Sequence, residues 1–221
     1  MGRGTPCTER TDAMTEEPKE PDKPREAPAG TAETPPPAPA GTMRLDLAID
    51  PRKTRAIVLT WPDHSLTWEA AAWLYNIFPP ENVLALCGTD LTAARNLSVR
   101  ELVLKAPPEI ADFVLMDRDM RPGPAAMPFL AADADVVGCE YPIPHMEGWA
   151  DPTAIHMGLV RVKRHVFERI AAPWFAFGHA PDGTAVAHCE CAYFANKARQ
   201  AGFRIVRAGW CGHDAKLPAC G

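Results

Sequence analysis

Short apolar runs alternate with helically spaced apolar residues along most of the chain after residue 43. The runs at 56–60, 83–87, 113–116 and 134–139 have the length and aliphatic content of buried strands. Between them, apolar residues in 66–77 and 91–104 recur three and four positions apart, as on one face of a helix. Strands that alternate with helices predict an α/β domain with a mainly parallel central sheet flanked by helices.

The second half of the chain has a different pattern. Residues 141–152 are rich in Pro, Gly, His and Trp, a composition that suits an active-site loop. Alternation then predicts a strand at 155–162, and a short amphipathic helix follows at 163–170. A helix is expected at 187–201, ending at Gly202 in the C′ position, before a last strand at 203–206. The sheet is expected to be mixed in this half.

The first 42 residues differ in composition from the rest. They hold nine of the 24 prolines, eight acidic and five basic side chains, and almost no large apolar group. Such a segment cannot bury enough surface to offset its ordering entropy, so we expect a disordered tail over 1–42 and one domain over 43–221. It lacks the apolar region of a signal peptide and is too acidic for a transit peptide. Alternatively, translation begins at Met43.

Charge and cysteine content narrow the classes of function. Residues 43–221 carry 18 basic and 20 acidic side chains, which gives no general attraction to nucleic acid. No apolar run approaches the ~18 residues of a membrane span. Seven cysteines without a secretion signal indicate free thiols in a reducing compartment. We therefore expect a cytoplasmic protein.

The most informative polar feature is the pair Asp117 and Asp119, which follows the apolar run 113–116. Open α/β sheets bind ligands at the carboxyl ends of their strands. Two carboxylates there can share a hard divalent cation, which commonly carries a substrate diphosphate. The alternative is a loop in which Asp119 caps a turn beside Arg118. Taken alone, the pair leaves both interpretations open.

Four segments in order resemble glycosyltransferases of the GT-A fold, related to the family-2-like group. Ala94-Arg95-Asn96 resembles an "A-R-N" segment, and Val114 to Met120 resembles the apolar strand with its D-x-D motif. Gly158 to Phe167, followed by Pro173-Trp174-Phe175, resembles the acceptor-side "G-x-x-x-I-x-R-x-V-F … P-W-F" segment. Cys189 to Phe203 resembles "E-D-x-x-F-x-x-x-A-x-x-x-G-F", and His213 follows at about the usual distance. The order and spacing of the four carry the resemblance.

The resemblance implies a role for each matching residue. Asp117, Asp119 and His213 would face Mn²⁺ or Mg²⁺ on the diphosphate of a nucleotide-sugar donor, in many relatives with the second aspartate as the closer ligand. An imidazole is an acceptable partner to carboxylates for Mn²⁺. Arg95 would approach the nucleotide or its phosphates. The other implied nucleotide contacts are Thr60, Trp61 and Asp90.

The implied activity is metal-dependent transfer of a sugar, expected from a UDP-sugar, to an acceptor hydroxyl. The metal neutralises the leaving diphosphate, so no protein acid is required. An inverting enzyme needs a base for the acceptor, and Glu190 is the matching carboxylate of the "E-D" motif. The aspartate position of that motif is Cys191, and a thiol is a poor base for an alcohol. Three alternatives follow: Glu190 acts as the base alone, the enzyme is retaining, or its activity is impaired. His156 is a further residue that could reach the acceptor.

The acceptor stays open at this point. Candidates are a hydroxymethylated base in phage DNA, since compact transferases of this type occur in viral genomes, a glycan, a lipid-linked molecule and a protein. An alternative of another class is a non-catalytic nucleotide-binding or interaction protein with a structural zinc site. Cys189, Cys191, Cys211 and His213 would supply its ligands. Against it, a helix over 187–201 would point Cys189 and Cys191 to different faces.

Overall fold

The structure is a computed structural model that describes residues 46–60, 65–88, 90–142, 155–179, 182 and 186–214. The tail predicted at 1–42, Trp61 and most of the loop predicted at 141–152 lie outside these residues. The expectations for those segments stay predictions.

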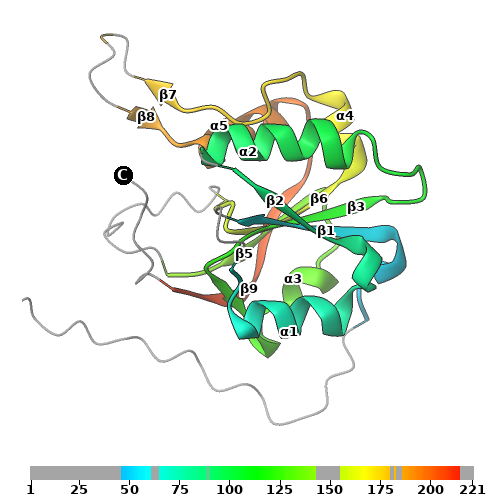
Figure 1. Cartoon of the computed structure of the whole chain (residues 1–221). Helices are drawn as coiled ribbons and strands as arrows, with labels where there is room; N and C mark the ends of the chain where they lie inside the picture. Colours follow the sequence, from blue (N-terminus) through cyan, green and yellow to red (C-terminus); the bar gives the residue numbers. More distant parts are fainter. Residues whose placement is uncertain are drawn as a thin grey trace, which may run out of the picture. The chain divides into compact units, whose positions relative to one another are not determined.

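The described part of the chain is built on a seven-stranded sheet in the order β2-β1-β3-β6-β5-β9-β4 (Figure 1). Strands β1, β2, β3, β5 and β9 run in one direction, whereas β6 and β4 run against their neighbours. The sheet is therefore mainly parallel, with its antiparallel pairs in the second half as predicted. The strands are β1 (Thr54–Thr60), β2 (Val83–Cys87), β3 (Asp112–Asp117), β4 (Met120–Pro122), β5 (Val136–Glu140), β6 (Leu159–Lys163) and β9 (Ile205–His213).

Helices cover both faces of this sheet (Figure 1). Residues of α2 (Leu91–Ser98), α4 (Arg164–Arg169) and α5 (Glu190–Gln200) pack in the apolar cluster on one face. Those of α1 (Trp68–Ile77) and α3 (Met127–Ala131) pack in the cluster on the other. Because the sheet is buried on both faces, its central strands read as continuous apolar runs rather than alternating ones. A π-helical turn (Val99–Val103) extends α2, and a separate pair joins β7 (Gly178–His179) to β8 (Val186–His188).

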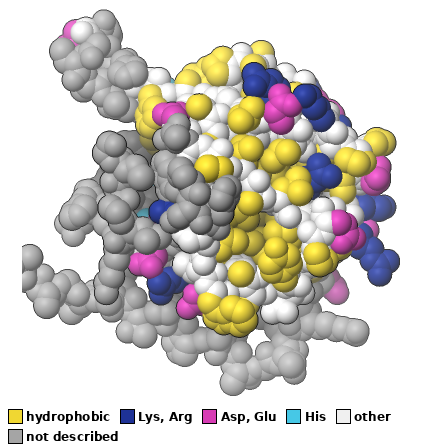
Figure 2. Space-filling view, in the orientation of Figure 1, with side chains coloured by type: hydrophobic (Ala, Val, Ile, Leu, Met, Phe, Trp, Pro, Cys, Tyr) yellow, Lys and Arg dark blue, Asp and Glu magenta, His cyan; other side chains and the backbone are white. Residues whose placement is uncertain are grey.

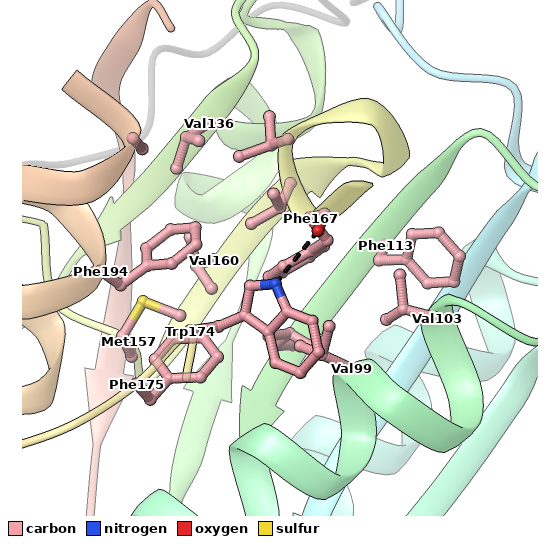
Figure 3. Close-up of a cluster of buried hydrophobic side chains, with 14 of the residues drawn as sticks. Val99, Val103, Phe113, Val136, Met157, Val160, Phe167, Trp174, Phe175 and Phe194 are labelled. Carbon is pink, nitrogen blue, oxygen red and sulfur yellow. Dashed lines mark hydrogen bonds between the residues drawn. The ribbon is translucent and has the colours of Figure 1, made fainter. Parts of the chain in front are cut away.

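The core on the α2, α4 and α5 face is largely aromatic (Figure 3). Phe175 stacks on Phe194 with ring centroids 5.0 Å apart, and the indole N–H of Trp174 donates to the carbonyl of Phe167 at 3.0 Å. Trp174 and Phe175 are both buried. They anchor the core and do not offer a surface for stacking a sugar ring, whereas Phe177 is exposed.

Helix ends follow local signals in the sequence. Thr67 caps α1, because its side chain accepts the amide of Ala70 at 3.1 Å. Asp90 caps α2 in the same way, and its side chain accepts the amide of Ala93 at 2.6 Å. Gly202 follows α5 with a φ of 83°, the left-handed conformation that glycine adopts without steric cost.

The described part of the face seen in Figure 2 shows no large patch of one charge. On the face seen in Figure 2, basic, acidic and apolar side chains are interspersed. Among the described residues, no helix has both the length and the apolar character needed to cross a bilayer.

Candidate metal and acceptor site

Asp117 and Asp119 lie where β3 leaves the sheet, as the sequence predicts. Asp117 is the last residue of β3, and its amide donates to the carbonyl of Gly158 at 2.7 Å. The amide of Arg118 donates to the carbonyl of Leu59 at 3.2 Å, which fixes the turn against β1. The chain then enters β4, which pairs with β9 rather than with β3, so Asp119 stands in a tight turn between β3 and β4.

The end of β9 brings His213 to this turn. β4 pairs antiparallel with β9, and Met120 is the direct partner of His213. His213 Nε2 lies 3.2 Å from Asp119 Oδ2, and the amide of Asp214 donates to the carbonyl of Asp119 at 2.9 Å. This hydrogen bond to Asp119 raises the pKa of His213, while partial burial opposes the shift. A late histidine beside the D-x-D motif is therefore a feature of the fold.

The Asp119–His213 pair has the chemistry of a divalent cation site. Carboxylate oxygen and imidazole nitrogen together suit Mn²⁺. Adjacent ligands of an octahedral cation with bonds of about 2.1 Å stand about 3 Å apart, close to the observed spacing. His213 Nδ1 is buried and has no hydrogen-bond partner among the described residues. These donors fit Mn²⁺ or Mg²⁺, provided that the imidazole gives up its proton.

Asp117 faces a different partner, the buried guanidinium of Arg95. Arg95 Nη2 donates to both carboxylate oxygens of Asp117, at 3.0 and 2.8 Å, and Nη1 donates to Oε1 of Glu190. The Arg95 side chain is only 2% exposed, so in this conformation it offers no surface to a nucleotide. Its predicted contact with the phosphates stays a prediction, whereas its role as a bridge between two carboxylates is a finding.

Arg95, Asp117 and Glu190 form an ion triad in which the charges influence one another's pKa values. Burial alone would lower the pKa of Arg95, yet Asp117, Cys191 and Glu190 raise it above its ordinary value. Burial raises the pKa of Asp117 to about 6, against the opposing pull of Arg95. Two carboxylates and one cation leave one net negative charge beside the Asp119 turn. That charge favours a cation at the neighbouring pair.

Glu190, the predicted base, lies at the start of α5 with its side chain 7% exposed. It accepts from Arg95 and, at 3.4 Å, from the thiol of Cys191. His156 lies on the same side, its ring 5.8 Å from that of Tyr141, and burial lowers its pKa. His156 is therefore neutral at pH 7 and able to accept a proton.

Thr60 and the D-x-D turn line one open pocket. The pocket is bounded by the ends of β1 and β3, by Gly88 after β2 and by the start of α2. Gly88 is required here because a Cβ at this position would lie 2.6 Å from the Cβ of Ala94. Asp90 is exposed at the N-cap of α2, where its side chain is engaged with Ala93. Trp61, the remaining predicted nucleotide contact, lies outside the described residues.

The four ligands of the alternative zinc site do not come together. Cys189 and Cys191 offer sulfur atoms within 4.8 Å of each other and of a Glu190 oxygen. Cys211 is buried and its thiol donates to the carbonyl of Gly212 at 3.2 Å instead, and His213 contacts Asp119. The expectation that Cys189 and Cys191 face apart was wrong. The helix begins at Glu190, and Cys189 is its N-cap rather than a helical residue.

Tyr141 and Gly158 are site residues that the sequence reasoning did not single out. The amide of Gly158 donates to Tyr141 Oη at 3.0 Å, while its carbonyl accepts from Asp117. A Cβ on Gly158 would lie 2.6 Å from Tyr141 Oη and 2.7 Å from Met120 Sδ. The Tyr141 ring packs 5.3 Å from that of His213. Gly158 is the first residue of the acceptor-side motif, and this position was the one signal in the sequence that could have pointed to it.

Comparison with known proteins concerns the fold alone. No protein-family model matches the chain, and no curated protein matches it. The crystal structure of A197 from STIV is similar, with a TM-score of 0.50 and 15% identity, over 71% of this chain and 83% of that one. The catalytic domain of Drosophila beta1,4-galactosyltransferase 7 in complex with xylobiose gives a TM-score of 0.47 at 14% identity, covering 76% of each chain.

A putative nucleotide-diphospho-sugar transferase from Desulfovibrio desulfuricans G20 is a further structural neighbour, with a TM-score of 0.38 and 10% identity over 74% of this chain and 82% of that one. Nucleotide-sugar transferases thus occur among the structural neighbours, at low sequence identity. The predicted α/β fold, with a mainly parallel central sheet and helices on both faces, is confirmed. Membership of the family-2-like group stays a prediction.

Proposed function

We propose that this chain is a metal-dependent glycosyltransferase that moves a sugar from a nucleotide-sugar, expected to be a UDP-sugar, to an acceptor hydroxyl. The observation that carries the proposal is the contact of Asp119 with His213 at the carboxyl edge of β3. Ligand sites of open α/β sheets are found at this edge. A carboxylate and an imidazole brought together from distant parts of the chain form a donor set for a cation.

Asp119 and His213 would hold Mn²⁺ or Mg²⁺. Such an ion supplies charge neutralisation for a departing nucleoside diphosphate. Asp117 would act from beside it, because both of its oxygens are held by Arg95. We assign to Asp117 the orientation of ribose or of water near the ion, not direct ligation. The pocket that Thr60 and Asp119 line would receive part of the nucleotide.

Two residues are candidates for the base that deprotonates the acceptor. Glu190 matches the sequence motif, but its carboxylate is buried and committed to Arg95. His156 is only partly buried, and its burial lowers its pKa, which favours the neutral imidazole with one nitrogen free to accept a proton. We assign Glu190 the task of holding Arg95 and, through it, Asp117 in place. Whether Glu190 or His156 is the base is decided by the experiment below.

Calorimetry of UDP binding, with and without Mn²⁺, tests the metal site. We expect Mn²⁺-dependent binding that Asp119→Asn weakens about tenfold or more. Asp133→Asn is the matched control, because Asp133 is an exposed carboxylate beside Lys163, outside the site. Equal UDP affinity in Asp119→Asn and wild type would refute the metal assignment.

Release of UDP from UDP-sugars tests for catalysis. If Glu190→Gln reduces hydrolysis and an added external base does not restore it, Glu190 positions Arg95 and Asp117 rather than acting as the base. Selective loss of transfer in His156→Gln would assign the base to the histidine. UDP binding without any release of sugar would identify a nucleotide-binding protein instead of an enzyme.

A further inference from the structure

Three arginines surround an open hollow where α5 ends and β9 begins. Arg199 comes from the last turn of α5. Arg204 directly precedes β9, and Arg207 lies near the start of that strand. The floor is apolar and includes Ile155 and Phe203. The hollow measures about 380 Å³, within the range of ~300–1,000 Å³ that is typical of small-ligand clefts.

The guanidinium groups have spare hydrogen-bonding capacity. Arg199 Nη1 donates to Asn196 Oδ1 at 3.0 Å, but its Nη2 is buried without a hydrogen-bond partner among the described residues. Arg207 lies 3.9 Å from a carboxylate oxygen of Glu140, beyond hydrogen-bond distance, and Arg204 is exposed. A buried, unpartnered donor is costly unless a ligand or solvent satisfies it.

The charge around the hollow is positive. Arg169 adds a fourth guanidinium, whose carbon lies 5.3 Å from the centre of the Phe203 ring. No acidic residue is among the described residues that line the hollow. Two carboxylates lie at its margin: Glu140 stands 3.9 Å from Arg207, and Asp135 accepts the backbone amide of Arg204 and contacts His165. Planar guanidinium groups bind phosphate and carboxylate oxygens in pairs, so this arrangement suits an anion.

The hollow lies beside His156 in the chain, and Arg207 is close enough for its charge to act on that imidazole. Ile155, which lines the hollow, directly precedes His156. The charges of Arg207 and Glu190 both act on the His156 imidazole, with opposite effects on its pKa. The Tyr141 ring lies between His156, at 5.8 Å, and His213, at 5.3 Å. A molecule anchored at the arginines would therefore extend toward the candidate base and metal ligands.

We propose that Arg199, Arg204 and Arg207 bind a phosphate or carboxylate group of an anionic acceptor and hold its hydroxyl toward His156. This inference rests on the proposed glycosyltransferase function and names its acceptor class. Neutral sugars would lack the anchoring group.

The first test measures anion binding with metal chelated, so that the donor site is not engaged. Inorganic phosphate and glucuronate are titrated separately into ¹⁵N-labelled protein. We expect amide shifts at 203–207 and not at 117–119. Affinity should fall about tenfold or more in Arg199→Gln/Arg207→Gln. Whichever probe binds more tightly identifies phosphate or carboxylate as the anchor.

Matched variants separate charge from folding. Arg207→Lys keeps the charge and should retain part of the affinity, and Arg100→Gln removes an exposed arginine paired with Glu101 and should change nothing. Thermal unfolding confirms that each variant is folded. Saturable shifts confined to other residues, or equal affinity in wild type and the double variant, would overturn the proposal.

The second test uses transfer. With a UDP-sugar that the protein hydrolyses, glucose 6-phosphate and glucuronate should be better acceptors than glucose, and the double variant should raise their KM. Glucose used as well as both anions would overturn the acceptor assignment while leaving the glycosyltransferase standing. Conversely, phosphate binding at 203–207 without UDP–Mn²⁺ binding would sink the proposed function and leave the anion site intact.

Discussion

His213 Nε2 lies 3.2 Å from Asp119 Oδ2, although the two residues are 94 positions apart in the chain. The contact follows from strand pairing, because Met120 of β4 is the register partner of His213 in β9. Both residues are thus placed by strand pairing and need little side-chain ordering to meet. This pre-organisation is the property expected of a metal site that must bind without refolding.

His213→Gln should lower Mn²⁺ affinity about tenfold or more, because an amide is a weaker ligand than an imidazole. Electron paramagnetic resonance of free Mn²⁺ measures this directly. His165→Gln, which removes a histidine paired with Asp135 away from the turn, serves as the control. A control that lost as much affinity would show a general rather than local effect.

Arg95→Met should destabilise the protein by ~3–5 kcal/mol, because it leaves the buried carboxylate of Glu190 and the partly buried one of Asp117 without their cation. The triple variant Arg95→Met/Asp117→Asn/Glu190→Gln should recover much of this loss, since no charge is then left unpaired. Urea unfolding measures both. If the triple variant lost as much unfolding free energy as its three single variants together, the charge-pairing explanation would be contradicted. Arg100→Gln is the control, and its unfolding free energy should differ from that of wild type by ~0.5 kcal/mol or less.

The Asp119–His213 contact should make stability depend on pH in the metal-free protein. The folded-state pKa of His213 is raised, so its contribution is fully present below about pH 6.5, the ordinary pKa, and is lost as pH rises through the folded value. The difference in melting temperature between wild type and His213→Gln, measured in EDTA, should shrink from pH 5.5 to pH 8.5. A difference that stays constant would mean that the histidine is not charged in the folded state.

Gly158→Ala should cost ~1–3 kcal/mol, because the new methyl group would overlap Tyr141 Oη and Met120 Sδ. It should also weaken Mn²⁺ binding through the displaced turn. Gly123→Ala is the matched control, as a Cβ there meets nothing within 4 Å. Thermal unfolding and Mn²⁺ titration of the two variants provide the comparison.

Cys189 should be the most reactive of the described cysteines at pH 7. The hydrogen bond from Cys191 lowers the pKa of Cys189 to about 6, so the thiolate predominates. Mass spectrometry after brief iodoacetamide treatment should find it alkylated before Cys139 and Cys211, which are buried. Cys191→Ala should slow the reaction. An unchanged rate in that variant would locate the cause of the reactivity elsewhere.

Local patterns predicted much of the framework. The run at 83–87 is β2 in full, Asp90 caps α2, and Gly202 follows α5. These features depend on a few neighbouring residues, so periodicity and capping chemistry suffice to find them. The strand expected at 203–206 continues instead to His213, because pairing with β5 and β4 extends it beyond its apolar start.

The sequence indicated the D-x-D turn and its histidine but not the pairing inside the site. Arg95 was expected at the nucleotide, which stays a prediction, and no local pattern shows that it meets Asp117 and Glu190. The thiols of Cys189 and Cys191 were placed apart because α5 was expected to start three residues too early. Both points concern side-chain direction, which tertiary packing decides.

The peptide of Gly158 has a consequence for how this protein can change. Its amide donates to Tyr141 Oη and its carbonyl accepts from the amide of Asp117, so one residue joins the residue after β5 to the end of β3. A substitution that displaced this backbone would therefore act on the Tyr141 ring and on Asp117 at once, and the two cannot be varied independently through position 158.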